Sequence, residues 1–319
     1  MVKVCVVIPY YQSDSAPLVR AIHSILAQEG VDRPHVLIVD DGSPCPARKI
    51  LDENFPGHEA FIRIIAQENG GAAKARNMGL DHLPESASHI AFLDSDDEWV
   101  ADHLANALHL LEQGCDFYFA DHQRAEWDSG KFSRIGLSLD RHKCLDDAAG
   151  LYEYTGEILF PVMVDHMIQT SSVVYSKLML GDIRFPVDLV LGEDEIFWVK
   201  AMRRARKTGF CSKVEVRMGK GVNISQGGEW GDERSFQLMA QNIRYWQSVP
   251  DLLPEETQIE PLRRLKTSQL RQNFAASVWY RIRRGKTLPM RPIASFTSSD
   301  PGWFFSLWAV LFKHIAGKP

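Results

Sequence analysis

Short apolar runs alternate with amphipathic segments along the first 120 residues. Residues 4–8 are a continuous run of apolar, mostly β-branched side chains that ends at Pro9. Such a run is typical of a strand buried on both faces of a parallel sheet. The pattern predicts further strands at 36–39, 61–66, 89–93 and 116–120, with helices over 18–26, 72–83 and 104–111. This alternation predicts an α/β domain with a doubly wound sheet.

The pattern becomes irregular between about 121 and 170, and it gives no clear elements there. A strand is predicted at 171–175 and a helix at 193–206. Residues 219–231 are rich in glycine and polar side chains, which predicts a mobile loop.

The chain after about 235 has a helical pattern, in which Leu270, Phe274, Val278 and Ile282 recur every four residues. Residues 261–319 contain eleven Lys or Arg but a single acid, Asp300, so the basic charge is concentrated in this tail. We therefore expect one α/β domain over 1–225 and a helical, basic extension over 226–319. Within the domain, a nucleotide-sugar half would cover about 1–120 and an acceptor half about 121–225.

The composition excludes several classes of protein. Hydrophobic residues make up 45% and charged residues 24% of the 319 residues, which are ordinary globular values. A net charge of −5 argues against a nucleic-acid partner. The five cysteines are odd in number and form no CxxC pair, which favours a reducing, cytoplasmic compartment. The first residues do not resemble a secretory signal, and no apolar run reaches the ~20 residues of a membrane span.

Acidic residues follow two of the predicted strands. Asp40 and Asp41 come after the second strand, and Asp94, Asp96 and Asp97 come after the fourth. Ligands of open α/β sheets bind at the carboxyl ends of the strands, so both groups would face one crevice. An Asp-x-Asp turn offers the oxygen ligands that Mg²⁺ or Mn²⁺ prefers beside a diphosphate. The alternative is an ordinary turn and helix start, where acids are also favoured.

Two helix starts carry further candidate chemistry. Gly70 and Gly71 precede a helix, where backbone amides favour an anion, and Lys74 and Arg76 would add positive charge. The segment matches neither the P-loop nor GxGxxG, and a Gly-Gly pair is often an ordinary turn. Residues 193–195, Glu-Asp-Glu, begin another helix and would supply a general base. Their alternative role is to complement the helix dipole.

Five blocks in this order resemble family 2 glycosyltransferases with the GT-A fold. The blocks are Val-Val-Ile-Pro-Tyr-Tyr at 6–11, Val-Asp-Asp-Gly-Ser at 39–43, Glu-Asn-Gly-Gly-Ala-Ala-Lys-Ala-Arg-Asn-Met-Gly at 68–79, Phe-Leu-Asp-Ser-Asp-Asp at 92–97 and Gly-Glu-Asp-Glu-Ile-Phe-Trp at 192–198. The resemblance covers roughly residues 1–225. The chain length and Gly-Val-Asn-Ile at 221–224 are most similar to bacterial exopolysaccharide glucosyltransferases of the succinoglycan type.

The resemblance implies a role for each candidate residue. At the nucleotide-sugar donor, Pro9 and Tyr11 would lie along the uracil and ribose, and Asp41 would hydrogen-bond the uracil or ribose with Asp40 beside it. Asn69, Lys74 and Arg76 would lie near the ribose, diphosphate or sugar of the donor. Asp94 would face the ribose or the donor sugar. Asp96 would ligate Mg²⁺ or Mn²⁺. Asp194 would be the catalytic base, and Glu193 would contact other acceptor hydroxyls or cap the helix. GT-A enzymes often complete the metal shell with a C-terminal histidine, but 219–231 contains none.

The expected activity is inverting, metal-dependent transfer of a sugar, glucose or a similar hexose, from a UDP-sugar to a growing, lipid-linked saccharide. One alternative is a sugar nucleotidyltransferase, which is disfavoured because Pro9-Tyr10-Tyr11 follows strand one in place of a glycine-rich loop with arginine. The other alternative is a protein that binds nucleotide sugars without catalysis, which would not need Asp194. Trp127, Trp230 and Trp246 are candidates for stacking on sugar rings, with plain packing as the alternative.

Residues 303–312, WFFSLWAVLF, are too short to span a bilayer but are suited to its interface. Together with the basic stretch before them, they predict peripheral contact with the cytoplasmic face of the inner membrane. The alternative is a helix that packs on the protein itself.

Overall fold

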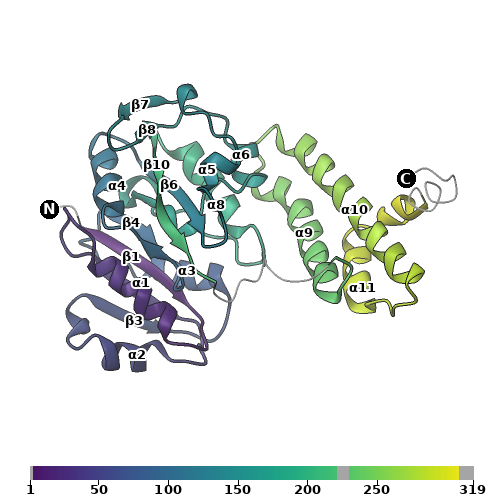
Figure 1. The fold of residues 1–319 in the computed structure, drawn as a ribbon, viewed down its shortest axis with the longest axis horizontal. Coiled ribbons are helices and arrows are strands. Elements are labelled where there is room, and N and C mark those ends of the chain that lie inside the picture. The colour runs from purple at the N-terminus through teal and green to yellow at the C-terminus, as the bar shows by residue number, and fades with distance from the viewer. Residues whose placement is uncertain (1–2, 221–229, 309–319) are drawn as a thin grey trace. The chain divides into compact units, whose positions relative to one another are not determined.

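The structure is a computed structural model that describes residues 3–220 and 230–308 (Figure 1). The chain forms two compact units. The first contains Met1–Asp188 and Glu193–Val222, and the second contains Leu189–Gly192 and Asn223–Pro319. The predicted domain boundary at 225, the 221–224 segment and most of the predicted loop at 219–231 lie outside the described residues.

A single mixed sheet forms the centre of the first unit. Its strands are β1 (Val4–Tyr10), β2 (His35–Asp40), β3 (Ile62–Ala66), β4 (His89–Phe92), β5 (Glu98–Trp99), β6 (Phe117–Arg124), β7 (Lys143–Asp146), β8 (Leu151–Glu153), β9 (Val174–Ser176) and β10 (Thr208–Met218). The spatial order is β3-β2-β1-β4-β9-β6-β10-β8-β7, and β5 pairs with β10.

The strand directions bring several carboxyl ends to one edge of the sheet. Strands β1 to β4 pair in parallel. Strand β9 is antiparallel to both β4 and β6, so β6 runs in the same direction as β4. Strand β10 is parallel to β6. The carboxyl ends of β1, β2, β4, β6 and β10 therefore share an edge, where the ligands of such sheets bind.

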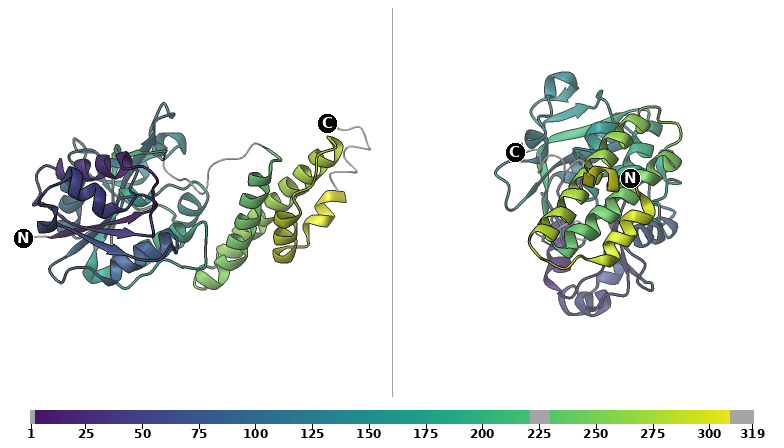
Figure 2. Two further views of the ribbon diagram at one scale, coloured as in Figure 1. Left: turned by 90° about the horizontal axis from the view of Figure 1, so that it is seen from below. Right: turned by 90° about the vertical axis from the view of Figure 1, so that its right-hand side faces the viewer.

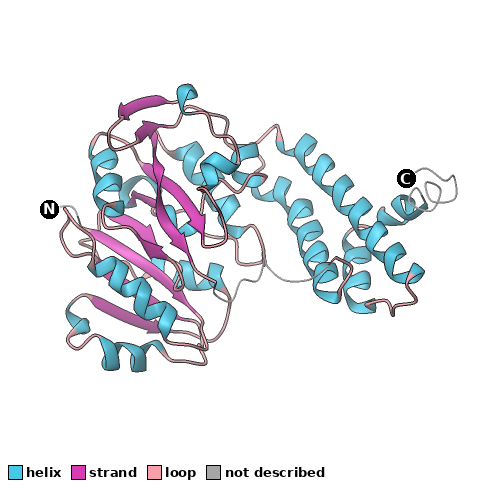
Figure 3. Cartoon of the chain, viewed as in Figure 1, coloured by secondary structure: helices cyan, strands magenta, loops and turns pink. Residues whose placement is uncertain are grey.

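Helices cover both faces of this sheet, as the doubly wound prediction requires (Figure 3). The helices of the first unit are α1 (Ala16–Leu26), α2 (Ala47–Asn54), α3 (Ala72–Asp81), α4 (His103–Glu112), α5 (Lys131–Arg134), α6 (Leu159–Met163), α7 (Lys177–Leu180) and α8 (Glu193–Arg204). Val6 and Ile8 of β1 share a core with residues of α1, α2 and α4. Val7, on the opposite face, contacts α3, because a Cβ at Gly79 would lie 2.4 Å from its Cγ1.

Among the described residues, the second unit contains the helices α9 (Glu233–Leu252), α10 (Ile259–Arg283) and α11 (Met290–Ser299) (Figure 2). Phe274 of α10 stacks on Phe296 of α11 at 3.9 Å between ring centroids. The four-residue repeat along α10 is only partly buried: Phe274 and Val278 lie in the core, while Ile282 is exposed. An α-helix has 3.6 residues per turn, so side chains spaced four residues apart shift gradually around the helix axis. The repeat of apolar residues therefore moves away from the buried face along α10.

The elements predicted from the pattern are largely confirmed, with some corrections. The predicted strand at 171–175 begins as a 3-10 turn, and only Val174–Ser176 is extended. Strand β10 was not predicted, and the irregular stretch at 121–170 contains β7, β8 and α6. No helix among the described residues has the length and apolarity needed to cross a bilayer.

Candidate active site

The acidic residues predicted to share a crevice follow two parallel strands that flank β1 in the sheet. Asp40 and Asp41 lie at the end of β2, and Asp94 and Asp96 lie just after β4. Strand β1 lies between β2 and β4 and ends at Tyr10. The candidate donor and metal residues are therefore arranged around the carboxyl end of β1.

Asp41 organises the glycine loop that precedes α3. Its carboxylate accepts hydrogen bonds from the backbone N–H of Gly70 at 2.7 Å and of Gly71 at 2.8 Å, and from the side chain of Gln67 at 2.7 Å. Asn69 donates to the Asp41 carbonyl at 3.0 Å. The two amides predicted to meet a ligand anion thus already bind a carboxylate of the protein. Contact of Asp41 and Asn69 with the nucleotide stays a prediction.

Asp40 has a structural environment of its own. One carboxylate oxygen accepts the backbone N–H of Ser43 at 2.9 Å and the other accepts that of Ala47 at 2.9 Å, at the start of α2. Tyr11 is 43% exposed, and Pro9 is half-buried at the end of β1. These positions leave the side chain of Tyr11 accessible to a ligand, whereas Asp40 is committed to the turn after β2.

Arg76 joins two acidic motifs that are far apart in the sequence. Its side chain is buried; Nη2 donates to Asp94 at 2.8 Å and Nη1 donates to Glu193 at 3.2 Å. The guanidinium also lies 5.4 Å from the ring centroid of Phe185. Although burial opposes it, the two carboxylates raise the pKa of Arg76 above its ordinary value. Arg76 therefore links the end of β4 to the start of α8.

Glu193 and Asp194 begin α8 in different environments. Burial, and next the Asp194 carboxylate, raise the pKa of Glu193 to about 7, while Arg76 opposes this shift. The Asp194 side chain accepts the N–H of Glu195 at 2.9 Å. Glu193 is thus held against Arg76, and Asp194 is the neighbouring carboxylate outside this ion pair.

The loop after β4 is fixed mainly by Asp97. Its buried carboxylate accepts hydrogen bonds from Ser171 Oγ at 2.6 Å and from the backbone N–H of Gly219 at 2.8 Å. Burial, with Asp94 and Asp96 nearby, raises the pKa of Asp97 to about 7. A Cβ at Gly219 would lie 1.9 Å from the Asp96 carbonyl oxygen, so only glycine allows this approach.

Several residues that build this site carried no sequence signal. Ser171 bonds both Asp97 and the backbone N–H of Asp94, and its carbonyl accepts the Trp99 indole N–H at 2.6 Å. Ser171, Phe185 and Gly219 lie far along the chain from the residues they contact. Lys74 lies exposed on α3, and the structure leaves its predicted role at the diphosphate untested.

The donor set suits a hard divalent cation. Asp94 and Asp96 supply carboxylate oxygens, the ligand type that Mg²⁺ and Mn²⁺ prefer. Asp94 pairs with Arg76, and Asp96, the second acid of the Asp-x-Asp turn, is partly exposed and stays the predicted ligand. The raised pKa of Asp97 also reflects negative charge gathered in this loop, which a cation would offset.

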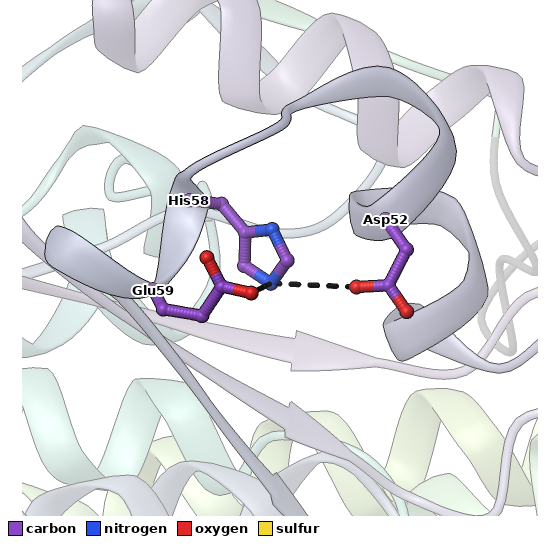
Figure 4. Close-up of side chains that lie close together, drawn as sticks. All are labelled: Asp52, His58 and Glu59. Carbon is purple, nitrogen blue, oxygen red and sulfur yellow. Dashed lines mark ion pairs between the residues drawn. The ribbon is translucent and has the colours of Figure 1, made fainter.

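A separate group of possible ligands lies at Asp52, His58 and Glu59 (Figure 4). His58 Nε2 lies 3.8 Å from a carboxylate oxygen of each acid. Arg48 Nη1 lies 3.5 Å from the same nitrogen, and a guanidinium there opposes a second cation. The loop after β4 therefore stays the candidate metal site.

Replacing Arg76 with methionine should destabilise the first unit by about 3–5 kcal/mol, because Asp94 and Glu193 would stay partly buried without their cation. Urea unfolding measures this. Arg20→Met is the matched control, since Arg20 pairs with Glu98 on the surface, where such pairs contribute about 0–1 kcal/mol. Equal losses in the two variants would contradict the linking role of Arg76.

The fold is that of known glycosyltransferase structures. TarS of S. aureus, residues 1–349, superposes with a TM-score of 0.56 at 16% identity, covering 99% of this chain and 92% of that one. The mannosyltransferase PcManGT of Pyrobaculum calidifontis, solved with GDP-Man and Mn²⁺, gives a TM-score of 0.55 at 17% identity, covering 99% and 88%. These likenesses establish a GT-A fold.

Sequence comparison then identifies the family. The family model described as Glycosyl transferase family 2 matches residues 5–165. The succinoglycan biosynthesis protein ExoW of Rhizobium meliloti is 31% identical over 259 residues, 79% of each chain. The putative teichuronic acid biosynthesis glycosyltransferase TuaG of Bacillus subtilis is 35% identical over 186 residues, 57% of this chain and 66% of that one. The chain belongs to glycosyltransferase family 2.

Proposed function

We propose that the protein is an inverting glycosyltransferase that moves glucose from UDP-glucose to a lipid-linked saccharide during assembly of a bacterial exopolysaccharide. The observation that carries the proposal is the Arg76 bridge, which joins the donor-side Asp94 to the start of α8, where Asp194 lies. Similarity to an exopolysaccharide and a teichuronic acid biosynthesis protein supports the pathway class. A GT-A domain over 1–225 and a helical extension over 226–319 belong to the same proposal.

In this mechanism Asp194 removes the proton of the acceptor hydroxyl, and that oxygen attacks the anomeric carbon from the face opposite the diphosphate. Backside attack converts an α-linked donor into a β-linked product. One base is sufficient, and general-base catalysis contributes roughly 10²–10⁴-fold. Arg76 hydrogen-bonds both Glu193 and Asp94. In the proposed mechanism this link holds the neighbouring Asp194 at a constant position relative to the donor.

The donor side of the site binds the nucleotide and the leaving group. Tyr11 and Asp41 are proposed to contact the uracil and ribose, and Lys74 to approach the diphosphate. Asp96 would hold Mg²⁺ or Mn²⁺, which when bound supplies charge neutralisation to the departing UDP. Related folds are described with different nucleotides, UDP-GlcNAc in TarS and GDP-Man in PcManGT. The choice of UDP-glucose therefore rests on the resemblance of the sequence motifs to exopolysaccharide glucosyltransferases.

The defining experiment is a scan of radiolabelled UDP- and GDP-sugars with membrane lipid extracts as acceptors, with Mn²⁺ or with EDTA. We expect transfer from UDP-glucose, release of UDP and a β-linked product, all lost with EDTA. In a parallel sample with added pyrophosphate, conversion of the UDP-sugar to UTP and sugar 1-phosphate would instead identify a nucleotidyltransferase. If no donor is hydrolysed or used for transfer, the protein would instead bind nucleotide sugars without catalysis, and the proposal would be contradicted.

The tail is proposed to bind the cytoplasmic face of the inner membrane. Phe305 is 81% and Trp308 is 64% exposed, which suits an interfacial segment next to a basic stretch. Trp303, in contrast, is buried in the core of the second unit, and Leu307 packs against that core, so this segment packs partly on the protein itself. Residues 309–312 lie outside the described part of the chain.

Point substitutions test this role better than truncation, because removing 300–319 would also remove Trp303 and the ion pair of Asp300 with Arg271. Phe305→Ser with Trp308→Ser should reduce flotation with anionic phosphatidylglycerol vesicles severalfold. Leu178→Ser is the control, because Leu178 is 89% exposed on the first unit. Unchanged flotation of the double variant would reject the membrane role.

A further inference from the structure

Three cations surround a single tryptophan in the first unit. The guanidinium carbon of Arg134 lies 4.9 Å from the ring centroid of Trp127, that of Arg124 lies 5.4 Å away, and Lys131 Nζ lies 5.8 Å away. Each contact is favourable, because the face of an indole ring is electronegative. The three cations nevertheless repel one another, so the cluster presents positive charge that a further anion would stabilise.

The acids near this cluster offset its charge unevenly. Asp128 pairs with Arg134 at 3.3 Å across an exposed surface, where it adds little. Burial lowers the pKa of Lys131, and Arg124 and Arg134 reinforce this effect, while Asp165 and, more weakly, Asp121 oppose it. Within the described residues, Lys131 makes no ion pair of its own. Lys131 is therefore the cation best placed to receive an external anion.

The cluster begins beside the loop that holds Asp96. Arg124 ends β6 and is the register partner of Met218 on β10. The next residue, Gly219, donates to Asp97 and packs against the backbone of Asp96. An anion bound by the cluster would therefore lie near the carboxyl edge of the sheet.

His166 connects the cluster to the candidate base. Its Nδ1 lies 2.5 Å from Glu195 Oε1, and Glu195 follows Asp194 at the start of α8. The hydrogen bond to Glu195 raises the pKa of His166, while burial and, as a smaller effect, the charge of Lys131 lower it. The side chain is 65% exposed.

The backbone of His166 is unusual. It is the non-glycine residue with positive φ, at 49°, among those the structure describes. Residues held in this region cost energy and cluster at binding sites. The backbone conformation and the Glu195 contact hold an exposed imidazole at the start of α8, where Asp194 lies.

We propose that Arg124, Lys131 and Arg134, gathered by Trp127 and extended by His166, bind an anionic group of the acceptor and so place its hydroxyl at Asp194. The inference rests on the proposed function and deepens it by naming the chemistry of the acceptor. Guanidinium and ammonium groups suit a phosphate or a carboxylate. That group belongs either to the phosphate of a lipid carrier or to an acidic sugar.

The test is anion binding by the full-length protein saturated with UDP and Mg²⁺, so that the donor site is filled. The probes are inorganic phosphate, for the lipid-carrier arm, and glucuronate, for the acidic-sugar arm. Binding is followed by NMR through the His166 ring signal, assigned by its loss in His166→Gln. Lys131→Gln is the test variant. Lys49→Gln is the control, because Lys49 is 71% exposed on α2.

We expect saturable shifts with at least one probe. Affinity should be at least about tenfold weaker in Lys131→Gln, the effect of one charge-assisted hydrogen bond, and unchanged in Lys49→Gln. The probe that binds identifies the source of the charge. Equal affinity in wild type and Lys131→Gln, or no saturable shift with either probe, would overturn the inference. Failure of UDP to bind at all would instead contradict the proposed function, so the two failures are distinguishable.

Discussion

Asp194→Asn is expected to lower turnover by at least ~10²-fold, the lower range for loss of a general base. The substitution is nearly isosteric, and an asparagine carbonyl can still accept the Glu195 N–H that Asp194 accepts at 2.9 Å. The start of α8 should therefore survive. The amide cannot take the proton of the acceptor hydroxyl, so kcat falls while affinity for the UDP-sugar changes little. Steady-state kinetics and UDP-sugar titration measure the two effects separately.

Glu193→Gln is the matched control for this prediction. Glu193 precedes Asp194 in the chain, but its carboxyl is partly buried and lies 3.2 Å from Nη1 of Arg76. A glutamine there still accepts a hydrogen bond from Arg76, so we expect a smaller loss of turnover. Wild-type kinetics in Asp194→Asn, or a larger loss in Glu193→Gln, would show that the base is the other carboxylate.

The parallel half of the fold was readable because its strands are buried on both faces. In β1, residues 4–8 are all buried, so no polar side chain interrupts the apolar run. Strand β10 escaped prediction for the opposite reason. It contains the buried Glu215, which is satisfied by Tyr118 at 2.6 Å, His103 at 2.8 Å and Asn106 at 2.7 Å. The carboxylate in its core interrupts the apolar pattern, and its partners lie about a hundred residues earlier.

The candidate site was predictable as a set of motifs but not as a set of contacts. The position of the acids after β2 and β4 followed from strand–helix alternation alone. The strand–helix pattern could not predict that the Gly70 and Gly71 amides bind Asp41, because a helix start favours a protein carboxylate as readily as a ligand phosphate. Arg76 was expected at the diphosphate, and its ion pairs depend on an approach of α8 to α3 that local patterns do not encode.

Asp96→Ala is expected to abolish turnover and Mn²⁺-dependent UDP binding. Asp96 is the second acid of the Asp-x-Asp turn after β4 and is partly exposed, and it is the proposed ligand of the cation. Without its carboxylate, the charge on the departing UDP would no longer be neutralised, a contribution of several kcal/mol to the transition state. Calorimetric titration with UDP, with and without Mn²⁺, measures the binding.

The loop itself should survive the change, because Asp97 and Gly219 fix its path through contacts that Asp96→Ala leaves in place. An unchanged thermal midpoint would separate loss of the metal from loss of the fold. Asp182→Ala is the matched control, since the side chain of Asp182 is 70% exposed and pairs with Arg204 on the surface. It should bind UDP with the Mn²⁺ dependence of the wild type. If Asp96→Ala also kept that dependence, the cation would have to be held by other residues, and the assignment of Asp96 would fail.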